Sequence, residues 1–246
     1  MRRLRETILP VKPSRVSVDR LGNIYLLGEG RLVKLSEEGH LQREREIETK
    51  EIALIDTWNP LRIWVYRKTG VKPQIQLLDQ ELMNAEEPFS PDESFALNPS
   101  LVAPGTNNFT YWILDEDRSL KQINTQSNSV QIETAPIHVP NGSEFINVKA
   151  YQGFIFLQGT DGLISIVNRL GQILRTIETG GAHHFGVLGE DLYFEKGGKL
   201  IFENLYNDSR YEVKLPEPAD YVLATDERLL IIKERSLKVF AFKPKS

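Results

Sequence analysis

The chain has 246 residues, of which 40% are hydrophobic and 26% charged, with 17 glycines, 13 prolines and no cysteine. This composition supports a sizeable hydrophobic core and excludes intrinsic disorder, collagen and coiled coil. Thirty basic and 34 acidic side chains give a net charge of -4, which lacks the basic excess of proteins that bind nucleic acid. The absence of cysteine excludes disulfides, thiolate zinc sites and iron–sulfur clusters.

Membrane and export signals are the next features to consider. The longest apolar runs, such as Phe154 to Leu157 and Leu229 to Ile232, have four residues, whereas a membrane-spanning helix needs roughly 20. Residues 1–10 carry basic side chains, but no apolar stretch follows them as it would in a signal peptide. We therefore expect no transmembrane segment and no signal peptide in this sequence.

A short apolar segment recurs along the chain after a polar turn. Its copies are spaced 37 to 48 residues apart and average 41. Their anchor residues are Ile24, Ile63, Tyr111, Phe154, Leu192 and Leu229. Such a period is typical of repeat architectures.

Each repeat carries further strand-like runs before and after its anchor. They alternate apolar and polar residues and are separated by Gly, Asn and Asp, while no window shows a sustained helical period. Four short strands about every 40 residues predict an all-β fold, a six-bladed β-propeller of four-stranded antiparallel blades.

The predicted single domain spans residues 1–246. Its blades are expected near 14–50, 51–91, 92–138, 139–179, 180–218 and 219–246. The last block holds only about three strands, and a strand-like piece at 3–8 precedes the first block. We expect this N-terminal strand, within residues 1–10, to complete the last blade and close the ring, because an open edge invites aggregation.

The first repeat contains Asp19-Arg20-Leu21-Gly22-Asn23-Ile24-Tyr25, which resembles the repeats of NHL-like six-bladed propellers. Asp161-Gly162 and Leu170-Gly171-Gln172 match the same repeat in part. Gly22 and Asn23 tolerate the positive φ of a tight turn, and the Asp19 carboxylate is placed to accept hydrogen bonds from backbone amides.

Two further segments, residues 55–62 and 107–116, resemble a group of uncharacterised bacterial envelope propeller proteins. The resemblance implies export, a periplasmic or cell-envelope location, and a binding role as a subunit of an envelope complex.

The sequence holds no signature of common catalytic sites. It has no Gly-x-Ser-x-Gly elbow, no phosphate-binding glycine loop before a helix and no His-Glu-x-x-His pair. We therefore expect a non-enzymatic scaffold that presents loops to a protein partner, with no cofactor and no nucleic acid. The oligomeric state stays open.

A metal site is the alternative. The candidate ligands are His138, His183, His184 and Asp161, which the topology places in blade-to-blade connections and in turns between second and third strands. If they met over the channel mouth, they would favour a metal-dependent hydrolase or lyase.

The partner-binding candidates lie in the second repeat and the long linker after it. Trp58 stands in a turn on the face opposite to the candidate metal ligands, and a tryptophan in a turn either packs locally or anchors a partner. Recognition of a sugar polymer by this and other turn aromatics is a third interpretation. Linkers longer than about 12 residues are usually functional or disordered, and the linker contributes Glu86, Glu87, Phe89, Asp92 and Glu93.

Overall fold

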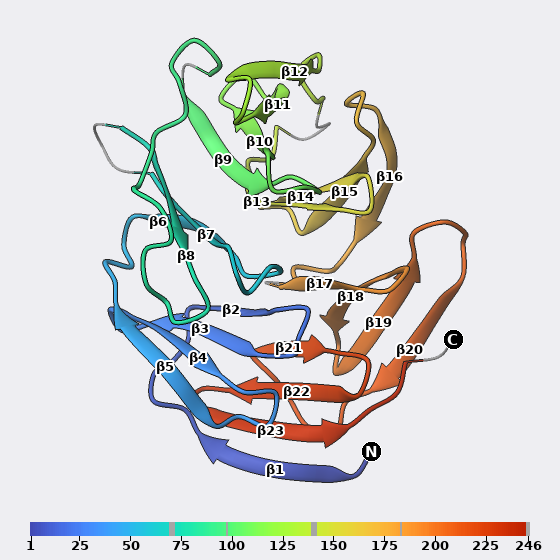
Figure 1. The fold of residues 1–246 in the computed structure, drawn as a ribbon. Helices are drawn as coiled ribbons and strands as arrows, with labels where there is room; N and C mark the ends of the chain where they lie inside the picture. Colours follow the sequence, from blue (N-terminus) through green and yellow to red (C-terminus); the bar gives the residue numbers. More distant parts are fainter. Residues whose placement is uncertain (69–71, 97, 139–141, 183, 245–246) are drawn as a thin grey trace. The chain divides into compact units, whose positions relative to one another are not determined.

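A computed structural model describes residues 1–68, 72–96, 98–138, 142–182 and 184–244. These residues form 23 strands in six antiparallel sheets, and none of them is helical (Figure 1). The all-β prediction is therefore confirmed. The anchors of the sequence repeat mark the second strand of every sheet, since each is the first or second residue of that strand.

The chain divides into two compact units, which we describe separately. Unit 1 combines residues 1–49 with residues 182–246, and unit 2 is the continuous segment of residues 50–181.

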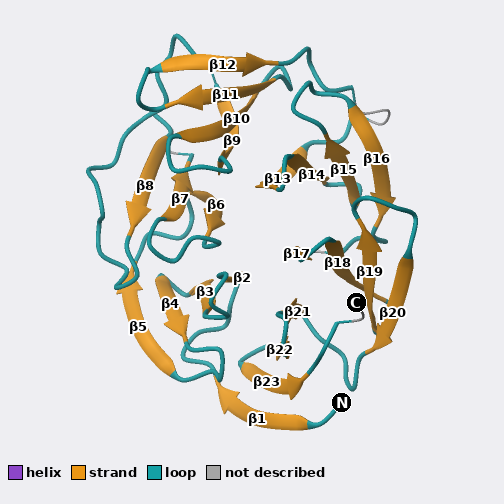
Figure 2. Cartoon of the chain, turned by 45° about the vertical axis from the view of Figure 1, so that its right-hand side comes forward, coloured by secondary structure: helices purple, strands orange, loops and turns teal. Residues whose placement is uncertain are grey.

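Unit 2 contains three sheets whose strands follow one another in chain order. The first sheet consists of β6 (Ile52–Asp56), β7 (Ile63–Arg67) and β8 (Gln74–Leu78). The second consists of β9 (Pro99–Pro104), β10 (Thr110–Asp115), β11 (Leu120–Asn124) and β12 (Ser129–Glu133). The third consists of β13 (Phe145–Tyr151), β14 (Phe154–Gly159), β15 (Leu163–Val167) and β16 (Ile173–Glu178). In Figure 2 the first strands β6, β9 and β13 lie on the same side of their sheets.

The sheet of β6 to β8 lacks a regular fourth strand. The linker takes that position through two isolated bridges, Ile75 with Phe89 and Leu78 with Asn84. Between the bridges four linker residues face two residues of β8, so the linker bulges away from the sheet. This blade departs from the four-stranded prediction because the linker cannot keep the register of a strand.

Unit 1 also contains three sheets. The first consists of β2 (Arg15–Val18), β3 (Ile24–Gly28), β4 (Arg31–Leu35) and β5 (Leu41–Glu46). The next consists of β17 (Phe185–Leu188), β18 (Asp191–Lys196), β19 (Lys199–Asn204) and β20 (Arg210–Lys214). The last consists of β21 (Tyr221–Ala224), β22 (Arg228–Lys233), β23 (Ser236–Ala241) and β1 (Arg3–Ile8).

The N-terminal strand completes the last sheet as predicted. β1 runs antiparallel to β23, with Thr7 opposite Leu237 and Glu6 opposite Lys238. The backbone hydrogen bonds from Leu9 N to Arg235 O and from Ala241 N to Arg2 O extend this pairing at both ends.

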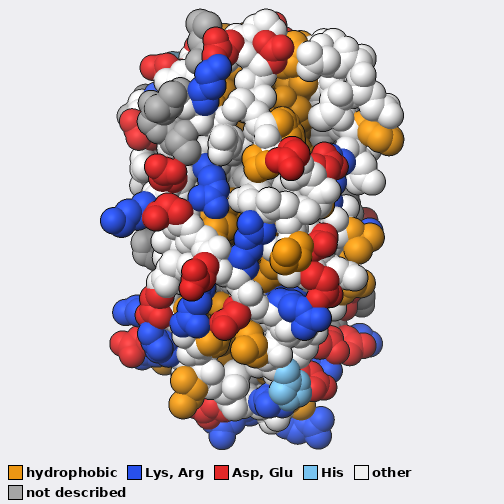
Figure 3. All heavy atoms as spheres, turned by 60° about the vertical axis from the view of Figure 1, so that its left-hand side comes forward, with side chains coloured by type: hydrophobic (Ala, Val, Ile, Leu, Met, Phe, Trp, Pro, Cys, Tyr) orange, Lys and Arg blue, Asp and Glu red, His pale blue; other side chains and the backbone are white. Residues whose placement is uncertain are grey.

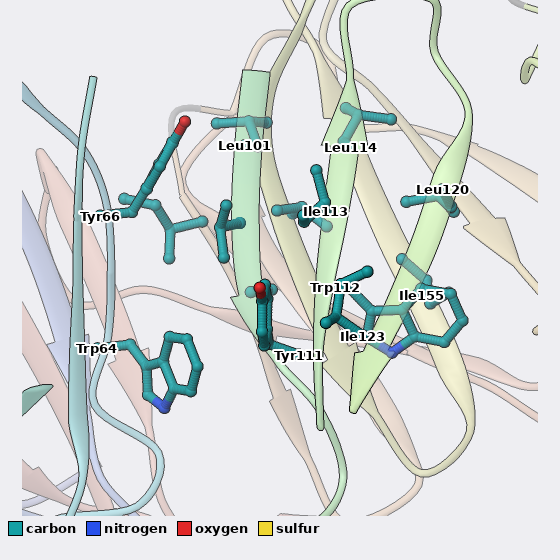
Figure 4. Close-up of a cluster of buried hydrophobic side chains, with 14 of the residues drawn as sticks. Trp64, Tyr66, Leu101, Tyr111, Trp112, Ile113, Leu114, Leu120, Ile123 and Ile155 are labelled. Atoms are coloured by element: carbon teal, nitrogen blue, oxygen red, sulfur yellow. The ribbon is translucent and has the colours of Figure 1, made fainter. Parts of the chain in front are cut away.

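The core of unit 2 lies between its sheets and is rich in aromatic rings. Figure 4 shows Trp64 and Tyr66 of β7 pointing toward Tyr111 of β10 and Leu101 of β9. The ring centroids of Trp64 and Tyr111 are 5.8 Å apart, and the Tyr66 hydroxyl donates to the carbonyl of Pro99 over 2.6 Å. These rings fill the wedge between neighbouring blades, as expected for large side chains on second strands.

Successive turns of an antiparallel meander lie at alternate ends of its sheet. The first and third turns share one end, which we call the odd-turn end, and the second turn lies at the other, which we call the even-turn end. Trp58 lies in the first turn of its sheet, and Asp161 lies in the second turn of its own.

Candidate functional site

The turn between β6 and β7 is held rigidly by its own polar groups. The buried carboxylate of Asp56 accepts a hydrogen bond from the Trp58 amide at 3.0 Å, and the Asn59 side chain accepts one from the Leu61 amide at 3.2 Å. The side chains of Trp58 and Leu61 are left 36% and 60% exposed. The turn therefore holds two large apolar groups in solvent on a fixed backbone.

Trp58 also contacts the last residues of β13, two sheets away within unit 2. Its ring meets the Tyr151 ring edge-on, with centroids 5.5 Å apart and an interplanar angle of 87°. The Lys149 ammonium lies 6.0 Å from the Trp58 ring centroid and 3.3 Å from Asp56 Oδ2. The pair of Lys149 and Asp56 is mostly buried, so Trp58 rests on an electrically neutral base.

Arg62 ties this turn to its neighbours. One guanidinium nitrogen donates to the carbonyl of Asn108, in the turn between β9 and β10, and the other lies 3.3 Å from the Glu86 carboxylate. The guanidinium also lies over the Trp64 ring, 5.8 Å from its centroid. Arg62 thereby holds the odd turns of two sheets and the linker together.

The turn after β8 lies at the same end. Ile63, at the start of β7, pairs with Leu78, at the end of β8. Leu78 in turn forms an isolated bridge with Asn84. The Asp79 carboxylate accepts hydrogen bonds from the amides of Glu81 and Met83, both at 2.9 Å.

Four exposed apolar side chains stand on these odd turns, and we call them the apolar turn surface. Leu61, Met83 and Phe109 are 60%, 63% and 49% exposed, and Trp58 is the fourth member. In the described part of unit 2, no large apolar side chain of the even turns is exposed. The exposed apolar groups are thus concentrated at one end of this unit.

The predicted linker residues divide into two groups. Glu86 and Glu87 are exposed, and Glu86 reaches the apolar turn surface through Arg62. Phe89 instead packs inward, with its ring centroid 6.4 Å from that of Trp64 and 6.2 Å from that of Tyr111. The backbone of Phe89 pairs with Ile75 and its partly buried ring packs against the core, while the contact of Phe89 with a partner stays a prediction.

Asp92 and Glu93 are exposed further along the linker. The Asp92 carboxylate accepts a hydrogen bond from the Ser94 amide at 2.9 Å, and this bond and that of the Ser94 side chain lower the pKa of Asp92. Glu93 lies 3.0 Å from Lys72. Both carboxylates thus have partners in the linker or beside it.

The candidate metal ligands have other surroundings. Asp161 accepts a hydrogen bond from the Leu163 amide at 3.0 Å in the turn between β14 and β15, and His138 is exposed. His184 belongs to unit 1, where its ring packs edge-on to Tyr221 at 6.5 Å, while His183 lies outside the described residues. Across the described ranges, no three His, Asp or Glu side chains are grouped to hold a metal ion.

Charge on the face drawn in Figure 3 is of both signs. Figure 3 shows acidic and basic side chains interspersed on the face that it draws, with hydrophobic side chains emerging between them. The described residues also contain no helix long and apolar enough to cross a membrane.

The sequence singled out Trp58 and Glu86 as candidate site residues, but not Leu61, Phe109 or Lys149. A large apolar residue directly after turn-forming residues could have indicated two of them, since Leu61 follows Asn-Pro and Phe109 follows Asn-Asn. No local sequence pattern points to Lys149, because its partner Asp56 lies 93 residues away in the chain.

The six successive antiparallel meander sheets define this chain as a β-propeller. No known protein family and no curated protein matches it by sequence. Among solved structures it is similar to the WD40 domain of Neurospora crassa Pan2, with 9% identity, a TM-score of 0.55, and coverage of 99% of this chain and 86% of that one. It is also similar to a chain of the mitotic checkpoint complex, with 9% identity, a TM-score of 0.62, and coverage of 99% and 92%.

At this identity the likeness concerns the fold alone, which is that of a β-propeller. The NHL-like repeat type and the envelope resemblance stay predictions.

Proposed function

We propose that this chain is a non-enzymatic scaffold that binds a protein partner on the apolar turn surface of unit 2. The observation that carries the proposal is the concentration of Trp58, Leu61, Met83 and Phe109 on fixed odd turns. Soluble proteins rarely leave large apolar side chains gathered together unless they contact a partner.

The composition of these turns supports a protein partner. Aromatic anchors surrounded by amide side chains are typical of protein-binding loops, because aromatic rings provide much contact area for little loss of conformational entropy. Here the amides are Asn59, Asn107, Asn108 and Gln152. The supports beneath Trp58 keep its conformation fixed before binding, which lowers the entropy cost of association.

The structural neighbours are consistent with such a role. One is a WD40 domain and another belongs to a complex of several proteins, and propellers commonly act as binding platforms, an analogy at the level of the fold. As part of the proposal, the resemblance of residues 55–62 and 107–116 supports a place in a bacterial envelope complex. Fractionation of source cells tests that location: recovery of the protein only in the cytoplasm would contradict it.

The test compares two variants of matched character. The first, Trp58→Ala with Leu61→Ser and Phe109→Ser, removes three of the four side chains of the apolar turn surface. The second, Ile8→Ser with Leu21→Ser, removes apolar side chains that are 85% and 65% exposed in unit 1. Partners captured from source cells are purified and titrated against the wild type and both variants.

We expect the first variant to bind at least about tenfold more weakly, a loss of about 1.4 kcal/mol, and the second to bind like the wild type. Trp58→Ala alone should lower the free energy of unfolding by less than about 1 kcal/mol, because its side chain is partly solvated. Equal binding by all three proteins would contradict the proposal.

A further inference from the structure

A cavity of about 290 Å³ lies on the last sheet of unit 1. It is lined by Glu217, Ile231, Lys233, Glu234, Ser236 and Lys238. In the hairpin of β22 and β23, Ile231 pairs with Lys238 and Lys233 pairs with Ser236. Directly opposed residues of an antiparallel pair share a face of the sheet, so these four side chains form one wall. Ligand pockets usually measure about 300 Å³ or more, so this cavity suits a small molecule.

The hairpin turn beside the cavity is held in place from two directions. The Glu234 amide donates a hydrogen bond to Asp220 Oδ2 over 2.7 Å. The Arg235 guanidinium donates to both carboxylate oxygens of Glu29, over 2.5 and 2.6 Å. The backbone that carries Lys233 and Glu234 is therefore fixed before a ligand binds, which lowers the entropy cost of binding.

The four charged side chains of the cavity divide into one ion pair and two groups without a partner. The Lys238 ammonium lies 2.5 Å from Glu217 Oε2 and 3.9 Å from Glu6 Oε1, so its charge is neutralised within the protein. Among the residues that the structure describes, neither the Lys233 ammonium nor the Glu234 carboxylate has an ion pair or a hydrogen bond. The cavity thus offers a cation and an anion on adjacent residues.

These groups match the two charged ends of an amino acid. A carboxylate binds strongly to a cationic donor such as Lys233, and an ammonium group binds strongly to an anionic acceptor such as Glu234. Apolar surface lies on the same wall, because Ile231 is buried in it. Ile8 of β1, which is 85% exposed, stands opposite Ser236 at its edge. A ligand with a single charge would leave one of the two polar groups unpaired.

We propose that this cavity binds a free α-amino acid with an apolar side chain. The α-carboxylate pairs with Lys233, the α-ammonium group pairs with Glu234, and the apolar side chain faces Ile231 and Ile8. The site lies in unit 1 and uses no residue of the apolar turn surface. The inference therefore goes beyond the proposed function and does not depend on it.

The experiment follows the backbone amide signals of the isotope-labelled full chain by NMR. Leucine, isoleucine, methionine and phenylalanine are added in turn, and the one that binds most tightly is tested again in two derivatives. Its N-acetyl form lacks the ammonium group, and its amide lacks the carboxylate. We expect the free amino acid to shift the signals of residues 231–238 with a dissociation constant of about 1 mM. Each derivative should bind about fivefold more weakly.

Two variants assign the charges to their residues. Lys233→Met and Glu234→Gln each remove one charge from the cavity, while Lys243→Met and Glu190→Gln make the same changes at exposed residues of unit 1 outside it. We expect each cavity variant to weaken binding about fivefold and each control to change it less than about twofold. Lys233→Met should also bind the amide as well as the free amino acid, a loss of discrimination that a folding defect would not produce.

The outcomes decide both the site and its ligand class. Signals that do not move with any of the four amino acids would overturn the site. Equally tight binding of the N-acetyl form or of the amide by the wild type would overturn the assignment to an amino acid. Equal binding by the cavity variants and their controls would do the same. Each of these results would leave the proposed partner binding of unit 2 standing.

Discussion

Two first turns, one in each unit, use a buried aspartate in different ways. Asp19, after β2, is 3% exposed, and Asp56, at the end of β6, is 6% exposed. Asp19 accepts hydrogen bonds from the amides of Leu21 and Asn23, from the Asn23 side chain and from the Tyr25 hydroxyl, all at 2.8 to 3.0 Å. Asp56 accepts one bond from its own turn, and its second oxygen faces Lys149.

The difference follows from the length and chemistry of the turns. The Asp19 turn is short, and Gly22, with φ of 84°, folds it back so that all of its donors reach one carboxylate. The Asp56 turn, residues 57–62, is one residue longer than residues 19–23 and contains no glycine. Both turns leave a leucine exposed, Leu21 in one and Leu61 in the other, but only the Asp56 turn carries a tryptophan, Trp58, which is supported from another sheet.

The comparison also gives a structural reason for the motif that resembles the NHL-like repeat. Asp19, Gly22, Asn23 and Tyr25 are parts of one hydrogen-bonded turn. The motif therefore reports how the turn is built and carries no information on a ligand.

The largest effect is expected from Asp19→Ala. The substitution leaves two amides and the buried Tyr25 hydroxyl without their acceptor, so we expect the free energy of unfolding to fall by about 2–4 kcal/mol. Denaturant titration measures it, with Asp19→Asn as the milder control. A loss below about 1 kcal/mol would show that water replaces the carboxylate and that the two turns do not differ as argued.

A smaller loss is expected from Asp56→Ala. It removes the acceptor of the Trp58 amide and leaves the Lys149 ammonium, with its side chain 20% exposed, without its carboxylate, at a cost of about 1–2 kcal/mol. Lys149→Met and the double variant complete a thermodynamic cycle with an expected coupling of about 0.5–1.5 kcal/mol.

Tryptophan fluorescence can follow the exposure of Trp58 in the same variants, because the other two tryptophans, Trp64 and Trp112, are buried. Acrylamide quenching of tryptophan fluorescence should increase in Asp56→Ala as the support of Trp58 is lost. If the two single substitutions have additive effects on the free energy of unfolding and quenching is unchanged, the ion pair does not position Trp58.

The smallest effect concerns Tyr25 and depends on pH. Burial, and then the charge of Asp19, raises the pKa of Tyr25 far above its ordinary value. Tyr25→Phe should cost about 1 kcal/mol at pH 8 because it removes a bond to a carboxylate. A raised pKa in the folded state gives stability that is complete below about pH 10, the pKa in the unfolded chain, and is lost as the pH rises.

At pH 11 the wild type should therefore lose about 1.4 kcal/mol that Tyr25→Phe does not lose. The difference between the two proteins should vanish or change sign, as measured by urea unfolding at both pH values. An unchanged difference would show that Tyr25 ionises equally well in the folded chain.

The fold was predictable from the sequence because its determinants are local. Alternating apolar residues, turn formers and the recurring anchors lie within a few residues of one another. The Asp19 turn was likewise predicted from the residues that form it. The incomplete last repeat indicated the pairing of β1 with β23, because an open edge needs a partner.

The site was predictable only in part because its determinants are distant. Trp58 was singled out as an aromatic residue in a turn, but its contacts with Tyr151 and Lys149 arise from the packing of separate sheets. Phe89 was read as a partner contact because the linker has no periodicity. Its inward packing depends on a gap beside Trp64 that the sequence does not reveal.

The pairing of β1 with β23 also sets the order in which the chain can fold during its synthesis. Unit 2 is a continuous segment that ends at Gly181, so all of its strands have been synthesised before residue 182 is added. The last sheet of unit 1 is completed later, because β1 stays without its partner until β23 has left the ribosome. Of the strands described here, β1 is thus the first to be made and among the last to be paired, and a chaperone that shields an exposed strand edge would act on β1 during that interval.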